Sequence, residues 1–571
     1  MKKIVKYSNI IFSKHLQKKF ILVSILSIFN SLLESLSIYL FVPLTKLITD
    51  PTYKVPLLNN IEFYNKLNLF NAVIFYLSLL TFIFLIKAYF SYLYTKIFNK
   101  FVFESQSYIS EKLFHNYLFR DYSFHLYSNT TELITNCSIE VNTFIGNVLM
   151  PLMTLISEIL IVFFVLSLLF VFEPLSTFIL TAFLIFFGFL FLKKFKNKSK
   201  KFGIRRQELE SIKNSLINQG LRGIKDLIVS NKREHLLAQF RKFNVESTTI
   251  GSNQNLFLNL MKIISEPLIA LLLLILVISW SLMGKEISGL IVFFTFLILA
   301  IYRTLPSIFK IINSVQSINF GFSAFNLILN ELSTNFNDEN YDNKSTLILD
   351  ENYEIVFDNV KFKYPNNDTL IFNNFNLTIN KGDKILILGK SGSGKTTFLN
   401  LILGLLKPIS GNIFINNVLF DENLSFIRSK IGYVSQNVYL SNSTILDNII
   451  MGDNNYDLEL LNKVIDVSDL NILIDSLPNG INTELSEGGI NLSGGQVQRI
   501  GIARALYSRP EIIVLDEFTS ALDLNTENLI FKKIMDNYKD KTVILVTHKK
   551  NFNYQDNLEI IFEKGILINR K

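Results

Sequence analysis

The chain has 571 residues, of which 49% are hydrophobic, and it carries a formal net charge of +8. A chain of this length exceeds the size at which one hydrophobic core keeps growing, so a single small domain is excluded. The one cysteine excludes an internal disulfide framework.

The positive charge is unevenly distributed along the chain. Residues 1–345 contain 34 Lys and Arg against 21 Asp and Glu, whereas residues 346–571 contain 22 against 27. Much of the excess lies in residues 1–20 and 193–206, directly beside apolar segments. Such charge is typical of the flanks of membrane helices rather than of a nucleic-acid surface. We therefore expect a membrane partner and no nucleic acid.

Six apolar runs in the first part are long enough to cross a bilayer. They lie near residues 20–48, 71–95, 145–172, 174–192, 255–283 and 287–312. The first run is too long for a secretion signal and lacks a small-residue cleavage site, so we expect it to remain as a span. We expect a six-helix membrane domain over residues 1–330, a linker over residues 331–350 and a second domain over residues 351–571.

The loops between runs two and three and between runs four and five are long and rich in Lys and Arg. The positive-inside rule places these loops and both termini in the cytoplasm. An amphipathic period continues beside the runs, so helices two to five are predicted to extend beyond the lipid and to reverse near residues 118–126 and 221–230. Apolar residues at helical spacing in residues 55–71 fit either a helix on the outer membrane surface or an ordinary connecting helix.

Basic side chains also occur inside the predicted spans. Arg303 and Lys310 stand seven residues apart, about two helical turns, so they share one face of the last span. A charge at bilayer depth is costly and usually faces a partner or a water-filled cavity. With Lys87, these cations either line a translocation cavity that attracts an anion such as a diphosphate, or form structural ion pairs. The candidate acids for such pairs are Glu34, Glu158 and Glu266.

After residue 350 the sequence changes to short β-rich runs that alternate with helices, as in an α/β domain. A glycine-rich loop follows the first strongly apolar strand and precedes a helix. Its residues are Gly389, Lys390, Ser391, Gly392, Ser393, Gly394, Lys395, Thr396 and Thr397. In this P-loop pattern the backbone N–H groups approach phosphate oxygens, the lysine reaches the β- and γ-phosphates, and the first threonine hydroxyl binds Mg²⁺. The loop predicts ATP binding.

Two carboxylates follow a second apolar strand, residues 512–515. We expect Asp516 to hold Mg²⁺ through water and Glu517 to act as general base on the water that attacks the γ-phosphate. The alternative, a solvated acidic turn, is disfavoured by the P-loop upstream.

The segment NLSGGQVQRIGIARAL, residues 491–506, contains the LSGGQ signature, and with it the sequence resembles the ABC transporter superfamily. The resemblance implies that the signature residues contact the γ-phosphate held by the P-loop of an opposite domain. These residues are Ser493, Gly494, Gly495 and Gln496. A helix N-terminus with an exposed hydroxyl and glycine amides suits an anion. ATP and Mg²⁺ are the implied cofactors.

The same resemblance assigns roles to isolated residues. Tyr364 resembles the aromatic residue that stacks on adenine, and Gln436 the glutamine that approaches both Mg²⁺ and the attacking water. His548, the only histidine after residue 345, resembles the switch histidine that contacts the γ-phosphate. Glu487 and Asp523 resemble the exporter X-loop glutamate and the aspartate that meets the other subunit. The sequence after His548 differs from the usual family continuation, which leaves the C-terminal packing open.

Six spans followed by one nucleotide-binding domain resemble an exporter-type half-transporter of the cytoplasmic (inner) membrane, with the ATPase domain in the cytoplasm. Because the chain supplies every element of the ATP site, a homodimer is the simplest assembly. The alternative is pairing with a related half-transporter.

The substrate class rests on a narrower resemblance. Residues 29–44 and 299–310 are similar to bacterial flippases of undecaprenyl-diphosphate-linked oligosaccharides, which implies a lipid-linked anionic substrate. A peptide, drug or other lipid exporter would share every ATP motif. Among these, a processing peptide exporter is disfavoured because the first span begins near residue 20 with no protease domain before it. A non-transport ATPase of the superfamily would lack the six spans.

Overall fold

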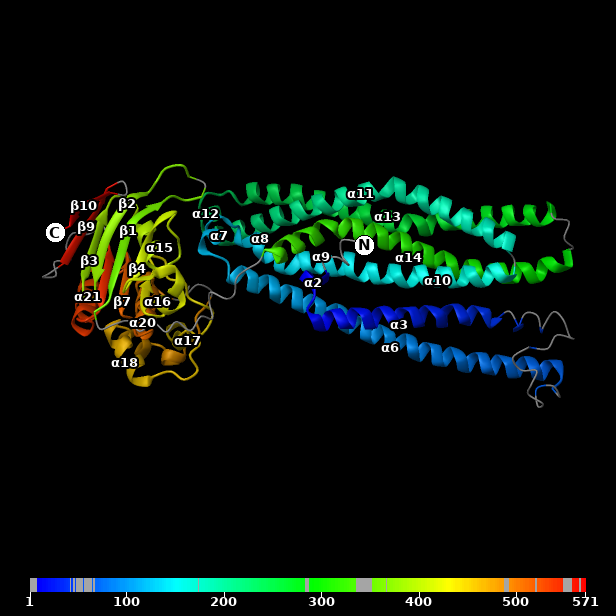
Figure 1. The fold of residues 1–571 in the computed structure, drawn as a ribbon, viewed down its shortest axis with the longest axis horizontal. Coiled ribbons are helices and arrows are strands. Elements are labelled where there is room, and N and C mark those ends of the chain that lie inside the picture. Colours follow the sequence, from blue (N-terminus) through cyan, green and yellow to red (C-terminus); the bar gives the residue numbers. More distant parts are fainter. Residues whose placement is uncertain are drawn as a thin grey trace. The chain divides into compact units, whose positions relative to one another are not determined.

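The computed structural model divides the chain into two compact units. It describes residues 8–41, 43–44, 47, 55, 64, 67–172, 174–282, 287–334, 352–365, 367–486, 492–518, 521–547, 557–563 and 566–570. One unit comprises Met1–Arg120 and Tyr127–Phe336, and the other Asp121–Leu126 and Asn337–Lys571. The first is built from long helices, and the second from two sheets with covering helices (Figure 1).

The helical unit is a bundle of long rods. Helix α14 packs along α10 and α11, α3 packs against α6 and α10, and α13 packs against α11. Two π-helical turns, η1 and η2, join three helices into one continuous rod. In chain order the elements are α2 (Ser8–Ile11), α3 (Lys14–Tyr39), α6 (Leu69–Leu118), α8 (Thr130–Thr135), η1 (Asn136–Glu140), α9 (Val141–Phe144), η2 (Ile145–Leu149), α10 (Met150–Phe172), α11 (Pro174–Arg222), α12 (Ile224–Val229), α13 (Arg233–Leu282) and α14 (Ile287–Ser333).

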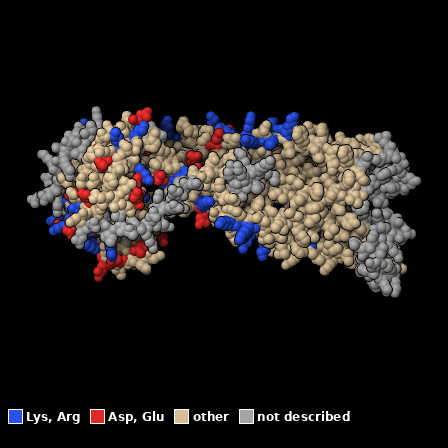
Figure 2. All heavy atoms as spheres, in the orientation of Figure 1, with Lys and Arg blue, Asp and Glu red and all other residues tan. Residues whose placement is uncertain are grey.

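Five helical stretches among the described residues are long and apolar enough to cross a membrane. They are Lys14–Ser37, Leu69–Leu118, Thr130–Val171, Thr177–Arg222 and Arg233–Ser279. The sixth expected span falls in α14, where most side chains before Ile301 lie outside the described residues. On the face shown in Figure 2, one broad region of the helical unit carries almost no charged side chain, while Lys and Arg gather at its other end.

The predicted extension of the helices beyond the lipid is confirmed. Helices α6, α11 and α13 contain 50, 49 and 50 residues, whereas about 20 residues are enough to cross a bilayer. The two long hairpins reverse at short helices, α7 (Tyr122–Tyr127) and α12, as predicted for the cytoplasmic tips. The expected surface helix at residues 55–71 lies largely outside the described residues.

The second unit contains an antiparallel sheet of order β2-β1-β4-β5 and a mainly parallel sheet of order β10-β9-β3-β8-β7-β6. Strands β3, β6, β7, β8 and β9 run parallel. The strands are β1 (Glu354–Phe362), β2 (Phe372–Asn380), β3 (Lys384–Gly389), β4 (Ser410–Ile415), β5 (Val418–Leu419), β6 (Ile431–Val434), β7 (Ile512–Asp516), β8 (Thr542–Val546), β9 (Asn557–Glu563) and β10 (Ile566–Arg570).

Short helices cover the sheets. They are α15 (Lys395–Ile402), η4 (Phe420–Asn423), α16 (Leu424–Ser429), α17 (Ile445–Ile450), α18 (Leu458–Val467), α19 (Asn471–Ser476), η5 (Gly480–Asn482), α20 (Gly494–Tyr507) and α21 (Leu524–Asn537). Because the parallel strands share one direction, the loops after β3, β6 and β7 all leave the same edge of the sheet, where α/β proteins bind ligands.

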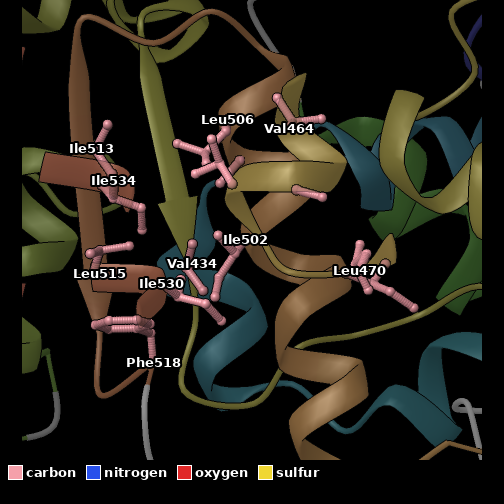
Figure 3. Close-up of a cluster of buried hydrophobic side chains, with 14 of the residues drawn as sticks. Val434, Val464, Leu470, Ile502, Leu506, Ile513, Leu515, Phe518, Ile530 and Ile534 are labelled. Carbon is pink, nitrogen blue, oxygen red and sulfur yellow. The ribbon is translucent and has the colours of Figure 1, made fainter. Parts of the chain in front are cut away.

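Strand β7 faces two hydrophobic cores, because successive side chains of a strand point to opposite faces. Ile513 and Leu515 belong to the core that α20 and α21 cover, together with Phe518 and Ile530 (Figure 3). Ile512 and Val514 belong to the second core, with Phe357, Phe398 and Phe562. All four strand residues are completely buried, which confirms the predicted buried strand before the two carboxylates.

A close backbone approach between α11 and α14 generates a first prediction. A Cβ atom on Gly203 would lie 1.9 Å from the carbonyl oxygen of Phe320, whereas one on Gly188 of the same helix would meet nothing within 4 Å. We expect Gly203→Ala to push the helices apart and to lower the free energy of unfolding by about 1–3 kcal/mol, as overpacking does.

The measurement is the unfolding temperature of the detergent-solubilised protein, with Gly188→Ala as the matched control. The control should unfold like the wild type. Equal unfolding temperatures for the two variants would show that this approach does not limit how α11 and α14 pack.

Candidate nucleotide-binding site

The P-loop connects the carboxyl end of β3 to the N-terminus of α15. Gly392 and Gly394 have φ angles of 80° and 107°, which residues other than glycine rarely adopt. A Cβ atom on Gly389 would lie 2.6 Å from the backbone oxygen of Phe562. The glycines are therefore required by the path of the loop. That path brings backbone N–H groups to the start of an α-helix, a natural site for a phosphate.

Lys395 lies inside this loop. Its side chain is buried, and its Nζ donates hydrogen bonds to the carbonyl oxygens of Gly389 at 2.6 Å and Lys390 at 3.1 Å. Burial lowers the pKa of the ammonium group, and the nearby carboxylates of Glu517 and Asp516 oppose that shift. The loop carbonyl oxygens and the carboxylates of Asp516 and Glu517 therefore stabilise the charged form of Lys395.

The loop also fits an anionic ligand in its polar groups. The hydroxyl of Ser393 is buried and has no hydrogen-bond partner among the described residues, so it is available to a phosphate oxygen. Thr396 is exposed at the first turn of α15. Its hydroxyl and the carboxylate of Asp516 are the hard oxygen ligands that Mg²⁺ prefers.

Glu517 occupies a strained position directly after β7. Its φ angle is 46°, a left-handed value that is uncommon for a residue with a long side chain. Its backbone N–H donates to the carbonyl oxygen of Val546 at 3.0 Å, and the next side chain, Phe518, is buried in the core of Figure 3. Gln436 Nε2 donates to Glu517 Oε2 at 2.6 Å. The backbone turn at Glu517 therefore directs its carboxylate, the expected general base, toward Gln436.

Asp516 has a partner that the sequence did not predict. The hydroxyl of Tyr433, on the adjacent strand β6, lies 3.4 Å from Asp516 Oδ2 as donor. Burial raises the pKa of Asp516, and the charge of Glu517 adds to the shift. The pKa of Tyr433 is also raised, first by burial and then by the charge of Asp516. The sequence signal that could have pointed to this contact is the position of Tyr433, three residues before Gln436.

Tyr364 lies beside the P-loop, as expected for an aromatic residue near the nucleotide. Its hydroxyl is 3.3 Å from the Thr397 hydroxyl, and its ring packs edge-on against Phe362 with centroids 5.2 Å apart. Its stacking on adenine remains a prediction.

The signature residues stand at the N-terminus of α20. Ser493 is exposed and forms a capping box with Gln496, whose side chain accepts from the Ser493 N–H at 2.8 Å. A Cβ atom on Gly495 would lie 3.0 Å from the backbone oxygen of Ala521, so the signature packs against the segment before α21. Asp523 caps that helix by accepting from the Thr526 N–H at 3.1 Å. Within the described part of the chain, no hydrogen bond joins residues 493–496 to the P-loop.

Two family models match the chain. The model of the ABC transporter transmembrane region matches residues 20–305, half of the chain, and the model of the ABC transporter matches residues 372–520. The chain belongs to the ABC transporters. The second match includes the P-loop, Gln436, the signature and both acids, so this ABC transporter combines a membrane domain and one ATPase domain in a single chain.

Curated relatives resemble only part of this ABC transporter. The alpha-hemolysin translocation ATP-binding protein HlyB of Escherichia coli O157:H7 is 39% identical over 217 residues, 38% of this chain and 30% of that protein. The lacticin-481/lactococcin-DR transport/processing ATP-binding protein lcnDR3 of Lactococcus lactis subsp. lactis is 36% identical over 279 residues, 48% of this chain and 39% of that protein. The chain thus spans well under half the length of these relatives.

A solved structure matches the fold over nearly the whole chain. A bacterial Atm1-family ABC exporter with ATP bound has a TM-score of 0.79 and 19% sequence identity, with 97% of this chain and 95% of that chain covered. The transporter therefore has the ABC exporter fold in both of its parts.

Two of the cations expected at the substrate site are paired in the structure. Lys310 Nζ lies 2.6 Å from Glu158 Oε1, and Lys87 Nζ lies 3.8 Å from Glu34 Oε2 and 3.0 Å from the Ser37 hydroxyl. These two cations are therefore not an uncompensated excess of charge, and the ion-pair alternative holds for both. Their place in a translocation cavity remains a prediction. The side chains of Arg303, Glu487 and His548 lie outside the described residues.

The contact between Gln436 and Glu517 generates a prediction about catalysis. Glu517→Gln keeps an oxygen that can accept from Gln436 but loses basicity, so ATP binding should persist. Steady-state ATP hydrolysis should fall by about 10²-fold or more, which is the usual worth of a general base.

Glu511→Gln is the matched control, because Glu511 precedes the same strand and pairs with Lys541 at 2.7 Å, away from the P-loop end. It should hydrolyse ATP at nearly the wild-type rate. A Glu517→Gln variant that kept half of the wild-type rate would remove Glu517 from the role of base.

Proposed function

We propose that two copies of this chain form an exporter in which ATP closes the two nucleotide-binding domains and hydrolysis releases them. One observation carries the proposal. The exposed Ser493 lies at a helix N-terminus without a hydrogen bond to the P-loop of its own chain, although both elements suit the same phosphate. A second chain supplies the missing half of each site.

Each residue near the P-loop then has a defined task. The loop amides and Lys395 would bind the phosphates, and Thr396 and Asp516 would hold Mg²⁺, which would neutralise phosphate charge. Glu517 accepts a proton from the attacking water, and the 2.6 Å hydrogen bond from Gln436 orients its carboxylate. The Tyr433 hydroxyl orients Asp516 from the other side.

Coupling to the membrane domain is proposed to run through the helical tips. The segment Asp121–Leu126 belongs to the compact unit of the ATPase domain. In the same unit, the Tyr433 hydroxyl contacts Asp516, and the charge of Tyr122 is one of the causes that raise the pKa of Tyr433. The first tip is therefore the route that we propose for coupling.

Mixed dimers test the shared site. When a Lys395→Ala chain pairs with a Ser493→Arg chain, one composite site carries both lesions and the other carries neither. We expect differently tagged, doubly purified dimers to trap ATP in one site, on the chain that retains Lys395. Homodimers of either variant are the controls and should lose both sites. Equal damage to the two sites of the mixed dimer would contradict sharing between chains.

For the substrate, we propose an undecaprenyl-diphosphate-linked oligosaccharide moved across the cytoplasmic membrane. Its support is the placement of Lys87, Arg303 and Lys310 on helices of the membrane domain, because cationic side chains can bind the phosphates of such a substrate. A polypeptide is the second candidate, since the names of HlyB and lcnDR3 refer to alpha-hemolysin and lacticin-481/lactococcin-DR.

ATP hydrolysis by the full chain in phosphatidylcholine liposomes separates the two candidates. We expect undecaprenyl-diphosphate glycans to stimulate hydrolysis severalfold, while undecaprenol and a panel of cationic peptides leave it at the basal rate. The Glu517→Gln variant is the control for contaminating ATPases. Stimulation by peptides and not by the diphosphate lipid would replace the flippase assignment with a peptide exporter.

A further inference from the structure

The ion pair between Lys310 and Glu158 is asymmetric in its exposure. Lys310, on α14, has a side chain that is 52% exposed, whereas that of Glu158, on α10, is 6% exposed. The cation therefore lies at the surface of the helical unit, and the acid lies behind it. The other described pair differs, because Lys87 and Glu34 are 19% and 22% exposed and Lys87 also donates to Ser37.

Only one of the two carboxylate oxygens of Glu158 has a hydrogen-bond partner in the described part of the chain. Its Oε1 accepts from Lys310 at 2.6 Å, but its Oε2 is buried without a hydrogen-bond partner in the described part of the chain. A buried carboxylate with one unpaired oxygen depends strongly on its single cation. A lysine ammonium has three donors, so the exposed side of Lys310 can receive a second anion while Glu158 holds the other side.

We propose that Glu158 is a positioning residue for Lys310. We also propose that its carboxylate competes with the diphosphate of a lipid substrate for the Lys310 ammonium group. The inference rests on the proposed lipid-diphosphate substrate. Glu158 holds the ammonium at one place on the surface of the helical unit. It also lowers the affinity of Lys310 for phosphate, because the Glu158 carboxylate and the diphosphate share one ammonium group. Binding therefore stays weak enough for the substrate to leave after translocation.

The test uses the full chain in phosphatidylcholine liposomes, with undecaprenyl diphosphate as the probe and ATP hydrolysis as the readout. Glu158→Gln should lower the half-maximal probe concentration by about 5-fold or more, within the usual range of coupling between two sites, without raising the maximal rate. A merely structural role would lower the rate and leave the half-maximal concentration unchanged. Undecaprenol, which has no phosphate, should act alike on wild type and variant, whereas any effect of free pyrophosphate should shift to lower concentration in Glu158→Gln, as for the probe.

Two further variants keep the test decisive. The single variant Lys310→Gln would leave the buried Glu158 carboxylate without its cation and could prevent folding. The double variant Glu158→Gln/Lys310→Gln removes both charges and avoids this problem. The double variant should fold and respond to the probe more weakly than the wild type. Glu246→Gln is the matched control, since Glu246 pairs with Arg205 at 2.7 Å in a half-exposed pair of α13 and α11. It should respond like the wild type.

The outcomes distinguish the inference from the proposed function. If the wild type responds to undecaprenyl diphosphate but Glu158→Gln shows an unchanged or higher half-maximal concentration, the competition by Glu158 is overturned and the flippase proposal stands. A double variant that responds like the wild type also overturns it. If the wild type does not respond to undecaprenyl diphosphate, the substrate proposal and this inference both fall.

Discussion

The parallel pairing of β3, β8, β7 and β6 is the constraint on which the ATP site depends. The pairing aligns Ile387 with Val546, Asp516 with Val546, and Val434 with Leu515. The P-loop, the two acids and the segment that carries Gln436 therefore leave the sheet at one edge, although the P-loop and the acids are more than 100 residues apart in the chain. The rigid buried strand β7 then lets a single strained residue, Glu517, turn its carboxylate toward Gln436.

Electrostatics explains how the two parts of the proposed shared site can be stable in one chain. Lys395 is surrounded by the loop carbonyls, and two carboxylates lie near it. These charges compensate one another without the signature. Ser493 and Gln496 satisfy each other through a capping box. Each part therefore has these polar groups compensated within one chain, as the proposed opening and closing between two chains requires.

In the membrane domain, too, positive side chains are paired with negative side chains of the same chain. Long apolar helices carry few charges, and Lys87 and Lys310 within them contact acids on neighbouring helices. Burying such pairs costs solvation energy and adds little stability, so their presence calls for a role in conformation or in ligand binding. The unequal exposure of Lys310 and Glu158 favours ligand binding at that pair.

Local sequence patterns were enough to predict a helical membrane domain followed by an α/β ATPase domain, and to name candidate residues for the ATP site. Apolar run length marks spans because a bilayer has a set thickness, and the P-loop and the acids after a buried strand follow local patterns that chemistry imposes. These signals lie within a few residues of one another, so no knowledge of long-range contacts was needed.

The contacts between side chains that are distant in the sequence depend on how the strands and helices pack. Tyr433 contacts Asp516 because β6 lies beside β7, and strand order is not encoded in any local period. Lys310 meets Glu158 across 152 residues of sequence. The spacing of Arg303 and Lys310 specified a helical face but not what that face touches, because helix packing depends on the combined shape of several helices. Ion pairing inside the membrane was therefore one of two alternatives until the helices were packed.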